Sequence, residues 1–391
     1  MSHAMAPVGQ PRPVLVSANS LWNILNFRGR LLERLSEAGY AVAVAAPSAA
    51  GSEGWPADRG THHEVRISSE GLNPGRDLLL VSAYVRLLRR LRPQIYLSFT
   101  AKPNIYGALA AGLVGVPAIP NVSGLGTAFI RGGALQRLIS LMYRVAFRRS
   151  PVVFFQNAED RDLFVGKKLV RMSQARLLPG SGVDLVRFQP PSQPRAESGG
   201  CTFLFVGRLL GDKGVRELVE AARLVRAVEP LATFQLLGFA GAANRTAIRE
   251  EELEGWERGG LIQYLGAADD VRPFLTAADA VVLPSYREGL PRSLLEAAAM
   301  ARPLIATDVP GNREVVVHGT NGLLCEVRSA SSLADALLRF IRLAPAEKRR
   351  MGEASRRLAE ERFSEEKVIA AYLEAIREVA GLPAPTSGVA G

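Results

Sequence analysis

The chain has 391 residues, 48% of them hydrophobic, and a formal net charge of +10; this length favours two domains, and the composition allows a core in each. Its two cysteines, Cys201 and Cys325, are too few and too far apart for a disulfide framework. The N-terminus lacks the features of a signal peptide, and the most apolar stretch, residues 107–120, is too short and too interrupted by Gly and Pro to span a bilayer, so we expect a cytoplasmic protein.

The positive charge is concentrated in the first half of the chain. Residues 1–190 hold 23 Lys and Arg against 11 Asp and Glu, whereas the remaining residues hold 25 against 27. This asymmetry indicates an anionic partner for the first half: nucleic acid, anionic lipid or a phosphorylated substrate. An arginine-rich genome would give the same excess without any partner.

Short apolar runs alternate with longer helical patterns along the first half. One such helical pattern, residues 27–39, ends on a glycine, as helices often do. The alternation favours parallel β-α-β units. We expect strands at residues 13–18, 41–46, 94–99, 117–122 and 152–157.

Residues 189–200 are rich in Pro, Ser and Gly and indicate a domain boundary. A second alternating series follows, and we therefore expect two doubly wound α/β domains, residues 12–190 and 191–364, with a ligand site in the cleft between them. A last helix, residues 365–381, comes after the second series is complete. The second series of strands is expected at residues 202–207, 234–239, 262–266, 280–285 and 303–308.

The segment PSYREGLPRSLLE, residues 284–296, carries two glutamates around a turn after an apolar strand. The helix that starts near Pro291 has free backbone N–H groups at its N-terminus, which favour phosphate. Glu288 and Glu296 would repel phosphate, but each carboxylate suits the paired hydroxyls of a sugar. Phosphates in the middle and hydroxyls at both ends describe a nucleotide sugar. The alternative is a helix whose acids merely complement its dipole.

The segment GRLLGDKG, residues 207–214, joins the strand at 202–207 to a helix. Gly207 allows a close backbone approach, and Arg208 and Lys213 can neutralise a diphosphate. The segment is neither a GxxxxGK[ST] phosphate loop nor a GxGxxG dinucleotide fingerprint. Basic residues on such a loop are often plain surface, but both segments occurring in one domain favour a donor site.

These motifs resemble the retaining family-4 glycosyltransferases of the GT-B fold. The resemblance rests on GR-x4-KG, the E-x7-E pair and ATDVPGNREVVVHGTNGLL (306–324), and it covers most of the chain, most strongly residues 202–330. Residues 18–28, 101–111 and 121–130 further resemble a subgroup that extends polyprenyl-diphosphate-linked sugars in bacterial glycan assembly.

The resemblance implies a role for each matching position. Arg208 and Lys213 would hold the donor diphosphate and stabilise its charge, Glu296 would hold the ribose, and Glu288 would contact the donor sugar. The remaining donor-side positions would be Gly207 in the first loop, Gly289, Leu290 and Pro291 at the pyrophosphate, and Gly238, Leu265 and Gly266 at the base. The nucleotide sugar, with UDP favoured, is a substrate, so no cofactor is implied.

One family feature is missing from this chain. Many relatives carry a histidine in the segment that here reads Phe99-Thr100-Ala101-Lys102. Lys102 and Asn104 are the polar residues available in its place. Asn19 and Arg28, near the first strand-to-helix loop, complete the candidate acceptor side, Arg28 as a contact for an acceptor diphosphate.

The residues also bear on mechanism and metal binding. No general base stands out in the first domain, and an inverting transferase would need one. Retention by front-face attack needs only the leaving diphosphate as proton acceptor, with Arg208 and Lys213 stabilising its charge; double displacement would require Glu288 as nucleophile. We expect no metal: Asp160 and Asp162 begin a helix, and the pair His62-His63 has no further ligands nearby.

Two helical patterns, residues 78–93 and 134–149, combine arginines with apolar residues. Such helices can lie on the inner face of an anionic membrane, where a lipid-linked acceptor would be found. Ordinary helices with solvated arginines are the alternative. Nucleic acid is disfavoured because basic and aromatic residues do not interleave.

We therefore expect transfer of a hexose or N-acetylhexosamine to a glycan or polyprenyl-diphosphate-linked sugar in bacterial cell-surface polysaccharide or glycoprotein glycan synthesis. One alternative is a nucleotide-sugar epimerase on a related fold, which would turn over the donor without an acceptor. The other is an inactive regulator that binds a sugar nucleotide.

Overall fold

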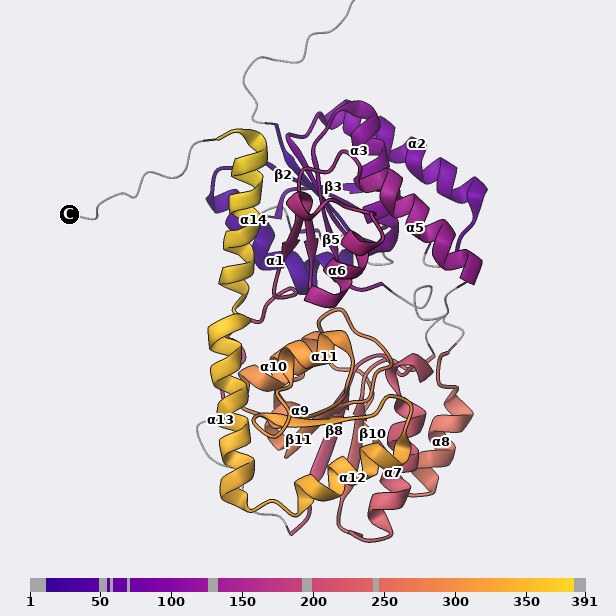
Figure 1. Ribbon diagram of the computed structural model, residues 1–391, viewed down its shortest axis with the longest axis vertical. Helices are drawn as coiled ribbons and strands as arrows, with labels where there is room; N and C mark the ends of the chain where they lie inside the picture. Colours follow the sequence, from indigo (N-terminus) through magenta and orange to yellow (C-terminus); the bar gives the residue numbers. More distant parts are fainter. Residues whose placement is uncertain are drawn as a thin grey trace, which may run out of the picture. The chain divides into compact units, whose positions relative to one another are not determined.

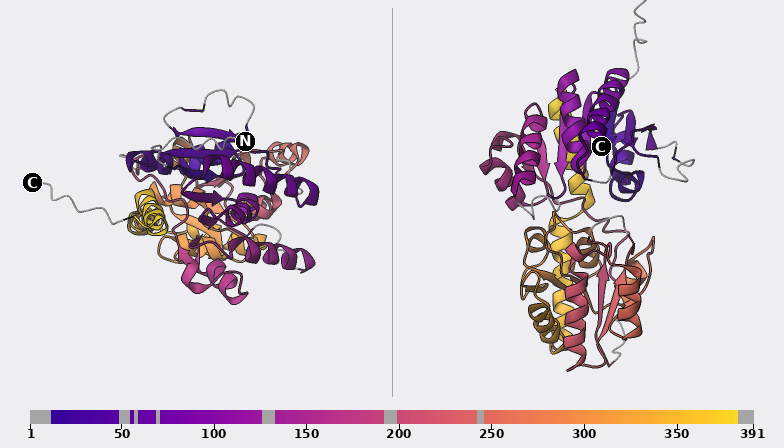
Figure 2. Two further views of the ribbon diagram at one scale, coloured as in Figure 1. Left: turned by 90° about the horizontal axis from the view of Figure 1, so that it is seen from above. Right: turned by 90° about the vertical axis from the view of Figure 1, so that its right-hand side faces the viewer.

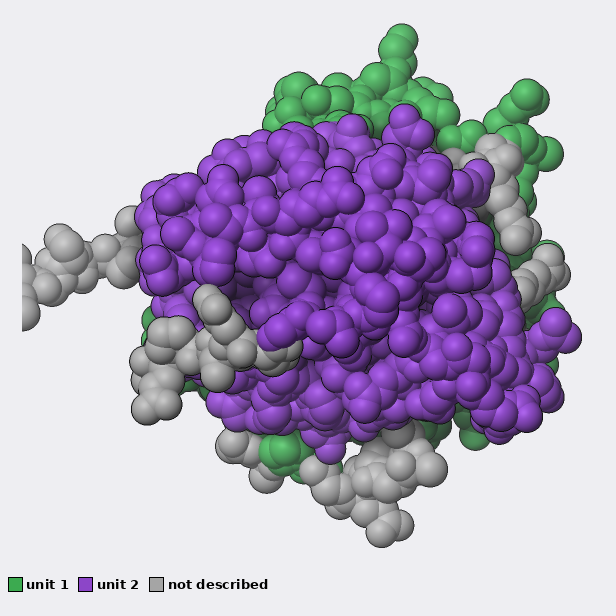
Figure 3. All heavy atoms as spheres, turned by 90° about the horizontal axis from the view of Figure 1, so that it is seen from below, with its two compact units in different colours: residues 1–178, 369–391 green, residues 179–368 purple. Residues whose placement is uncertain are grey.

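The computed structural model describes residues 12–48, 55–56, 59–68, 71–125, 133–191, 199–241 and 246–382. The chain divides into two compact units (Figure 3). Unit 1 comprises the residues up to Leu178 and those from Ile369 onward, and unit 2 runs from Pro179 to Val368. Residues 179–190, which we expected in the first domain, belong to unit 2. The reason is local: Val183 donates its N–H to the Phe363 carbonyl, and Phe188 lies in the core of unit 2.

The sheet of unit 1, drawn in indigo to magenta in Figure 1, is parallel throughout. Its strand order is β3-β2-β1-β4-β5-β6-β7. The first strand pairs on both sides, Val14 lying opposite Val42 in β2 and Ile95 in β4. Its central strands are continuous buried runs, as expected where helices cover both faces. The strands are β1 (Val14–Ser17), β2 (Val42–Ala46), β3 (Thr61–Glu64), β4 (Ile95–Phe99), β5 (Ala118–Val122), β6 (Val153–Phe155) and β7 (Ala175–Leu177).

Helices cover both faces of this sheet (Figure 2). Helices α2, α3, α5 and α6 share one core with Leu15, Tyr96 and Phe155, whereas α1 and α14 meet the opposite face at Phe99. The helices are α1 (Leu21–Glu37), α2 (Pro74–Leu91), α3 (Ala108–Val114), α5 (Gly133–Phe147), α6 (Ala158–Gly166) and α14 (Glu365–Ala380), with the short turns η3 (Pro103–Gly107) and η4 (Met172–Gln174).

The last helix is anchored to the sheet by one aromatic side chain. Tyr372 of α14 is fully buried and makes edge contacts with Phe99 and Phe154, at ring-centroid distances of 5.8 and 5.1 Å. Its hydroxyl also accepts a hydrogen bond from the Asn121 side chain at the end of β5. These contacts explain why residues from Ile369 onward belong to unit 1 although they follow unit 2 in sequence.

The sheet of unit 2 is also parallel, with the order β10-β9-β8-β11-β12-β13. The chain builds one side of this sheet first, through β9 and β10, and then returns to place β11 on the other side of β8. The topological switch point, where α/β proteins bind ligands, therefore lies between β8 and β11. The strands are β8 (Thr202–Val206), β9 (Thr233–Leu237), β10 (Gln263–Tyr264), β11 (Ala280–Leu283), β12 (Leu304–Thr307) and β13 (Gly322–Cys325).

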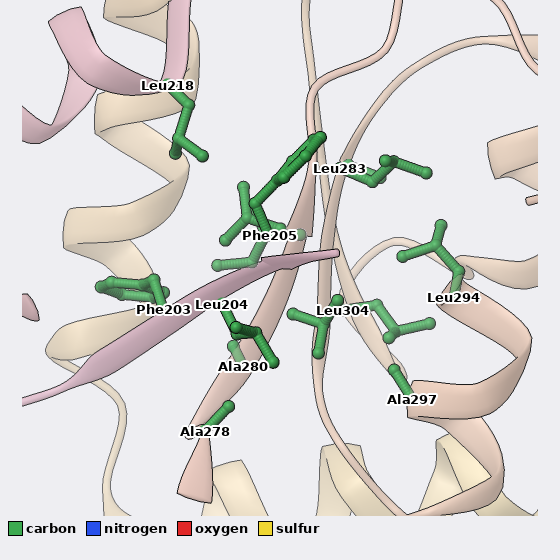
Figure 4. Close-up of a cluster of buried hydrophobic side chains, with 14 of the residues drawn as sticks. Phe203, Leu204, Phe205, Leu218, Ala278, Ala280, Leu283, Leu294, Ala297 and Leu304 are labelled. Carbon is green, nitrogen blue, oxygen red and sulfur yellow. The ribbon is translucent and has the colours of Figure 1, made fainter. Parts of the chain in front are cut away.

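The core of unit 2 packs these strands between helices (Figure 4). Leu294 and Ala297 of α10 face the strands from one side, and Leu218 of α7 lies among the same buried side chains. This packing fixes the first turns of α7 and α10, which follow the two expected donor loops. The helices are η5 (Gly211–Lys213), α7 (Val215–Arg226), α8 (Glu250–Arg258), α9 (Arg272–Ala277), α10 (Arg292–Ala299), α11 (Pro310–Val315), α12 (Ala330–Ile341) and α13 (Pro345–Arg362).

All ten expected strands are present, but three further strands were not expected. β3 holds the polar sequence Thr61-His62-His63-Glu64, β7 has only three residues, and β13 lies beyond the expected series. Among the described strands, β3, β7 and β13 lie at sheet edges and pair on one side only. The apolar runs that mark central strands are weak or absent in β3 and β7.

Candidate active site

The loops at the carboxyl ends of β8, β9 and β10 are joined by backbone contacts. Gly207 donates its N–H to the Leu237 carbonyl, and Gly238 donates its N–H to the Gly266 carbonyl, at 2.9 and 2.8 Å. Gly238 has φ +148°, and a Cβ there would stand 1.9 Å from the Gly207 carbonyl oxygen. Only glycine allows this approach, so the positions expected at the base, Gly238, Leu265 and Gly266, lie on loops next to that of Gly207.

A second close approach joins the β8 and β11 loops across the switch point. Gly214 has φ +72°, and a Cβ there would stand 2.0 Å from the Pro284 carbonyl oxygen. Next to it, Tyr286 donates its N–H to the Asp212 carbonyl at 3.0 Å. The two segments singled out from the sequence are therefore held against each other by their backbones.

Lys213 and Glu288 form an ion pair at this junction. Their side chains are 25% and 11% exposed, so the pair is partly shielded from water but open to a ligand. Arg208 lies exposed on the same loop as Lys213 and has no charged partner among the described residues. Lys213 and Glu288 thus meet at the switch point of the sheet, and Arg208 lies on the same loop as Lys213.

Glu296 lies one turn into α10, with its side chain only 12% exposed. Burial raises the pKa of this carboxyl, and Arg292, whose Nε lies 2.7 Å from Oε1, opposes the rise. Arg292 is four residues earlier on the same helix, the spacing at which helical side chains meet. The carboxylate is therefore held in one orientation by a neighbour and keeps acceptor capacity for hydroxyl groups.

The turn between Glu288 and α10 is enclosed by two glycines of other segments. A Cβ on Gly311 would stand 2.4 Å from the Gly289 carbonyl oxygen, and a Cβ on Gly180 would stand 2.5 Å from Leu290 Cδ2. Pro291 is the N-cap of α10, one position earlier than the first helical position that the sequence suggested for it. Gly289, Leu290 and Pro291 therefore form a rigid entry to the helix beside Glu288.

Several supporting residues were not singled out from the sequence. Tyr286 donates its hydroxyl to Glu217 at 2.6 Å; burial and this bond raise its pKa to about 12, so it remains a donor. The Thr307 hydroxyl donates to the Ser285 carbonyl, and the buried Asn312 amide donates to the Thr307 carbonyl at 2.9 Å. Arg292 was also missed, although its spacing of four from Glu296 in a predicted helix would have revealed the pair.

The four candidate acceptor-side residues lie in unit 1, and the structure buries two of them. Arg28 is 5% exposed and lies over the Phe99 ring at 4.2 Å, so it does not reach solvent as a contact for a diphosphate. Asn104 is 1% exposed because its amide bonds to Ser98 and to the Asn121 carbonyl inside the core. Lys102 pairs with Asp77 at 2.9 Å, and Asn19 is exposed.

The two weak metal patterns have structural partners of their own. Asn157 caps α6 by accepting the Asp160 N–H at 2.7 Å, and Asp162 pairs with Arg161. His62 contacts the Ala46 carbonyl, and His63 contacts Arg90. Within the described part of the chain, no group of three or more His, Cys, Asp or Glu side chains is arranged to hold a metal ion. In the same part, no helix has the length and apolar character needed to cross a membrane.

Two family models together match most of the chain. Residues 15–157 match the family model described as glycosyl transferase 4-like, and residues 200–342 match that of glycosyl transferases group 1. The chain therefore belongs to the glycosyltransferases, with a family-4-like first half and a group 1 second half.

Two curated relatives are each similar over about two thirds of the chain. An N,N'-diacetylbacillosaminyl-diphospho-undecaprenol alpha-1,3-N-acetylgalactosaminyltransferase of Campylobacter jejuni is 27% identical over 69% of this chain and 74% of its own. A UDP-Gal:alpha-D-GlcNAc-diphosphoundecaprenol alpha-1,3-galactosyltransferase of Escherichia coli is 26% identical over 66% of this chain and 69% of its own.

Solved structures confirm the expected GT-B fold. A sucrose-phosphate synthase from Thermosynechococcus elongatus is 18% identical and covers 95% of this chain and 99% of its own, with a TM-score of 0.78. HepE from Anabaena, solved with UDP-glucose, is 17% identical over 93% of this chain and 99% of its own, with a TM-score of 0.73.

Proposed function

We propose that the protein transfers a hexose or N-acetylhexosamine from a UDP-sugar, with retention, to a polyprenyl-diphosphate-linked sugar at a membrane surface. The observation that carries the proposal is the Lys213–Glu288 ion pair at the switch point of unit 2. A cation for the diphosphate and a carboxylate for sugar hydroxyls lie side by side there, with the Glu296 carboxylate one helix turn into α10.

The donor is proposed to enter with its diphosphate toward Lys213 and Arg208. Charge-assisted bonds from these cations to the phosphate oxygens are stronger than neutral ones. Lys213 then exchanges part of its contact with Glu288 for the phosphate, which frees Glu288 to accept hydroxyls of the donor sugar. Glu296, oriented by Arg292, accepts the two ribose hydroxyls. The Escherichia coli relative is named for a UDP-Gal donor, which supports UDP.

In the transfer step the acceptor hydroxyl attacks the anomeric carbon on the face that the diphosphate leaves. The carbon–oxygen bond to the diphosphate breaks as the new glycosidic bond forms, and a phosphate oxygen takes the acceptor proton. Arg208 and Lys213 stabilise the charge that grows on the leaving group. Glu288 is occupied by the hydroxyls of the donor sugar in this arrangement, so we assign it a binding role and not that of a nucleophile. Retention from an α-linked donor gives an α-glycoside, and both curated relatives are named for alpha-1,3 transfer.

A transfer assay with the full chain tests this proposal. Four donors, UDP-glucose, UDP-galactose and their two N-acetylated counterparts, are each offered with a short-chain polyprenyl-diphosphate N-acetylhexosamine. We expect one donor to give a disaccharide whose anomeric proton shows the small coupling of an α-linkage. A β-linked product would reject retention. Conversion of the donor to an epimer without acceptor would indicate an epimerase, and UDP binding without turnover would indicate an inactive regulator.

A further inference from the structure

Helix α5 of unit 1 exposes an apolar stripe along its length. Leu135, Leu138, Leu141 and Val145 recur every three or four residues and are 44%, 49%, 57% and 52% exposed. The opposite side of the helix buries Tyr143, Ala146 and Phe147 in the core of unit 1. The exposed stripe is therefore additional to the face that the fold needs.

Neighbouring helices of unit 1 expose further leucines. Helix α3 packs between α2 and α5 (Figure 1), and it exposes 63% of Leu113. At the start of α2, Leu78 and Leu79 are each 68% exposed. The stripe on α5 consists of neighbouring side chains on one side of a helix, and contiguous apolar surface of this kind indicates an interaction site, whereas single exposed leucines do not.

A basic groove runs beside the apolar stripe. Arg137 and Arg144 of α5 and Lys167, just after α6, line a groove of about 270 Å³ together with Ser140, Leu141 and Leu169. None of these three cations forms an ion pair with an acid in the described residues, and α5 itself contains no Asp or Glu. The groove therefore presents uncompensated positive charge next to exposed leucines.

We propose that α5 is a docking surface for an anionic phospholipid membrane, with its leucines in the interface and lipid phosphates in the groove of Arg137, Arg144 and Lys167. Helices that combine an apolar stripe with basic flanks lie in the plane of such membranes. Each basic side chain near an anionic surface strengthens binding, and the leucines add the burial of apolar area. This docking surface goes beyond the proposed function. It rests on that function only because a lipid-linked acceptor is found at a membrane.

A phospholipid surface fits these residues better than a nucleic acid does. Single-stranded nucleic acid is held by aromatic side chains on which bases stack. The exposed side of α5 carries leucines, a valine and arginines, and its tyrosine and phenylalanine are buried. Leucines gain free energy in a lipid interface but gain little against phosphate and ribose.

Sedimentation with vesicles tests the proposal without any need for activity. The full chain is mixed with vesicles of phosphatidylcholine alone or with added phosphatidylglycerol, and bound protein is measured. We expect binding to the anionic vesicles, weakened by salt, and loss of at least about 50-fold in the partition coefficient for the combined charge reversal Arg137→Glu, Arg144→Glu and Lys167→Glu. Leu138→Gln with Leu141→Gln should lower it by about 10-fold.

Matched variants in unit 2 separate this surface from net charge and general hydrophobicity. Arg339→Glu, Arg349→Glu and Arg350→Glu change the net charge by the same amount at exposed positions, and Val228→Gln with Leu231→Gln is the apolar control. Both should bind vesicles like wild type. Equal losses in the α5 variant and its control would overturn the proposal, as would tighter binding to a single-stranded oligonucleotide than to vesicles. UDP binding, measured in parallel, reports on the proposed function separately: vesicle binding without UDP binding would reject that function and leave the docking surface standing.

Discussion

Lys213 in the loop after β8 and Glu288 in the loop after β11 form an ion pair across the switch point of the second sheet. The two residues are 75 positions apart in sequence, and their side chains are 25% and 11% exposed. Before any donor is bound, each of the two charges is therefore neutralised by the other.

The strength of this pair can be measured by a double-mutant cycle. Lys213→Met and Glu288→Gln are each expected to lower the free energy of unfolding, because each leaves a partly buried charge without its partner. The double variant should lose less than the sum, giving a coupling energy of about 1–3 kcal/mol in urea denaturation. Additive losses would show that the two side chains do not interact in solution. The exposed pair Arg223–Glu220, at 2.6 Å on one helix, is the control and should show a much smaller coupling.

Gly214 is predicted to tolerate no side chain. Gly214→Ala combines a φ of +72° with a Cβ 2.0 Å from the Pro284 carbonyl oxygen, whereas Gly266→Ala has a similar φ of +73° with no atom within 4 Å. Gly266→Ala should therefore cost only the left-handed backbone penalty of about 1 kcal/mol, and Gly214→Ala at least about 2 kcal/mol more. Thermal unfolding of both variants measures the difference. Equal losses would mean that the two loops are not in contact at this point.

The raised pKa of Glu296 predicts a pH dependence of donor binding. Burial places this pKa above the ordinary value of a glutamate, so the proton binds at a higher pH in the folded protein than in the unfolded chain. Ionisation of Glu296 therefore lowers the free energy of unfolding as the pH rises through the range between the unfolded-state and folded-state pKa values. Donor binding changes in the opposite sense. The ionised carboxylate accepts the ribose hydroxyls, and this ionised form is lost as the pH falls through the raised pKa.

Titration calorimetry with UDP-glucose, whose phosphates do not titrate in this range, checks the effect. As the pH is lowered, the affinity for UDP-glucose should begin to fall at a higher pH than the one at which an ordinary glutamate titrates. Glu296→Gln should remove this pH-dependent step in affinity. Arg292→Gln should move the step to still higher pH, because Arg292 opposes the effect of burial. A wild-type affinity that stays constant down to the ordinary glutamate range would contradict the prediction.

Tyr372 is predicted to secure α14 to unit 1. Tyr372→Phe removes the hydroxyl bonded to Asn121 and should cost about 1–2 kcal/mol, since the Asn121 amide stays buried. Tyr372→Ala also removes the ring that contacts Phe99 and Phe154, so it should cost about 3–5 kcal/mol. Urea denaturation measures both losses. Losses below about 0.5 kcal/mol for both variants would show that α14 does not depend on this contact.

Much of unit 2 was predictable because its information is local. The strands β8 and β11 are short apolar runs, and the glycines and charged residues that follow them mark both loops as a candidate donor site. Spacing alone does not show that Lys213 and Glu288 touch, because that contact depends on Gly214 approaching Pro284 across the sheet. The sequence shows that Lys213 and Glu288 are charged residues in loops after strands. The contact between them follows only from how β8 and β11 lie next to each other in the sheet.

The acceptor side shows the opposite case. Asn104 was expected as a substitute for the missing family histidine, and Arg28 as a residue next to the first strand-to-helix loop, yet the fold buries both inside unit 1. Arg28 lies over Phe99, and Asn104 bonds to Ser98 and Asn121. Nothing in a single sequence distinguishes a polar side chain that meets solvent from one that satisfies a buried network. The domain boundary differed for a similar reason: the linker-like composition begins only after residues 179–188 have joined unit 2.

The most direct test of the donor site is the affinity of wild type and Glu296→Gln for UDP and for its 2′-deoxy analogue, measured by calorimetry. If Glu296 holds the ribose, removing the 2′-hydroxyl should weaken binding to wild type by about 10–100-fold and to Glu296→Gln by less than about 3-fold, because the partner is already gone. Equal losses on both proteins, or no binding of UDP to wild type at millimolar concentration, would contradict the account.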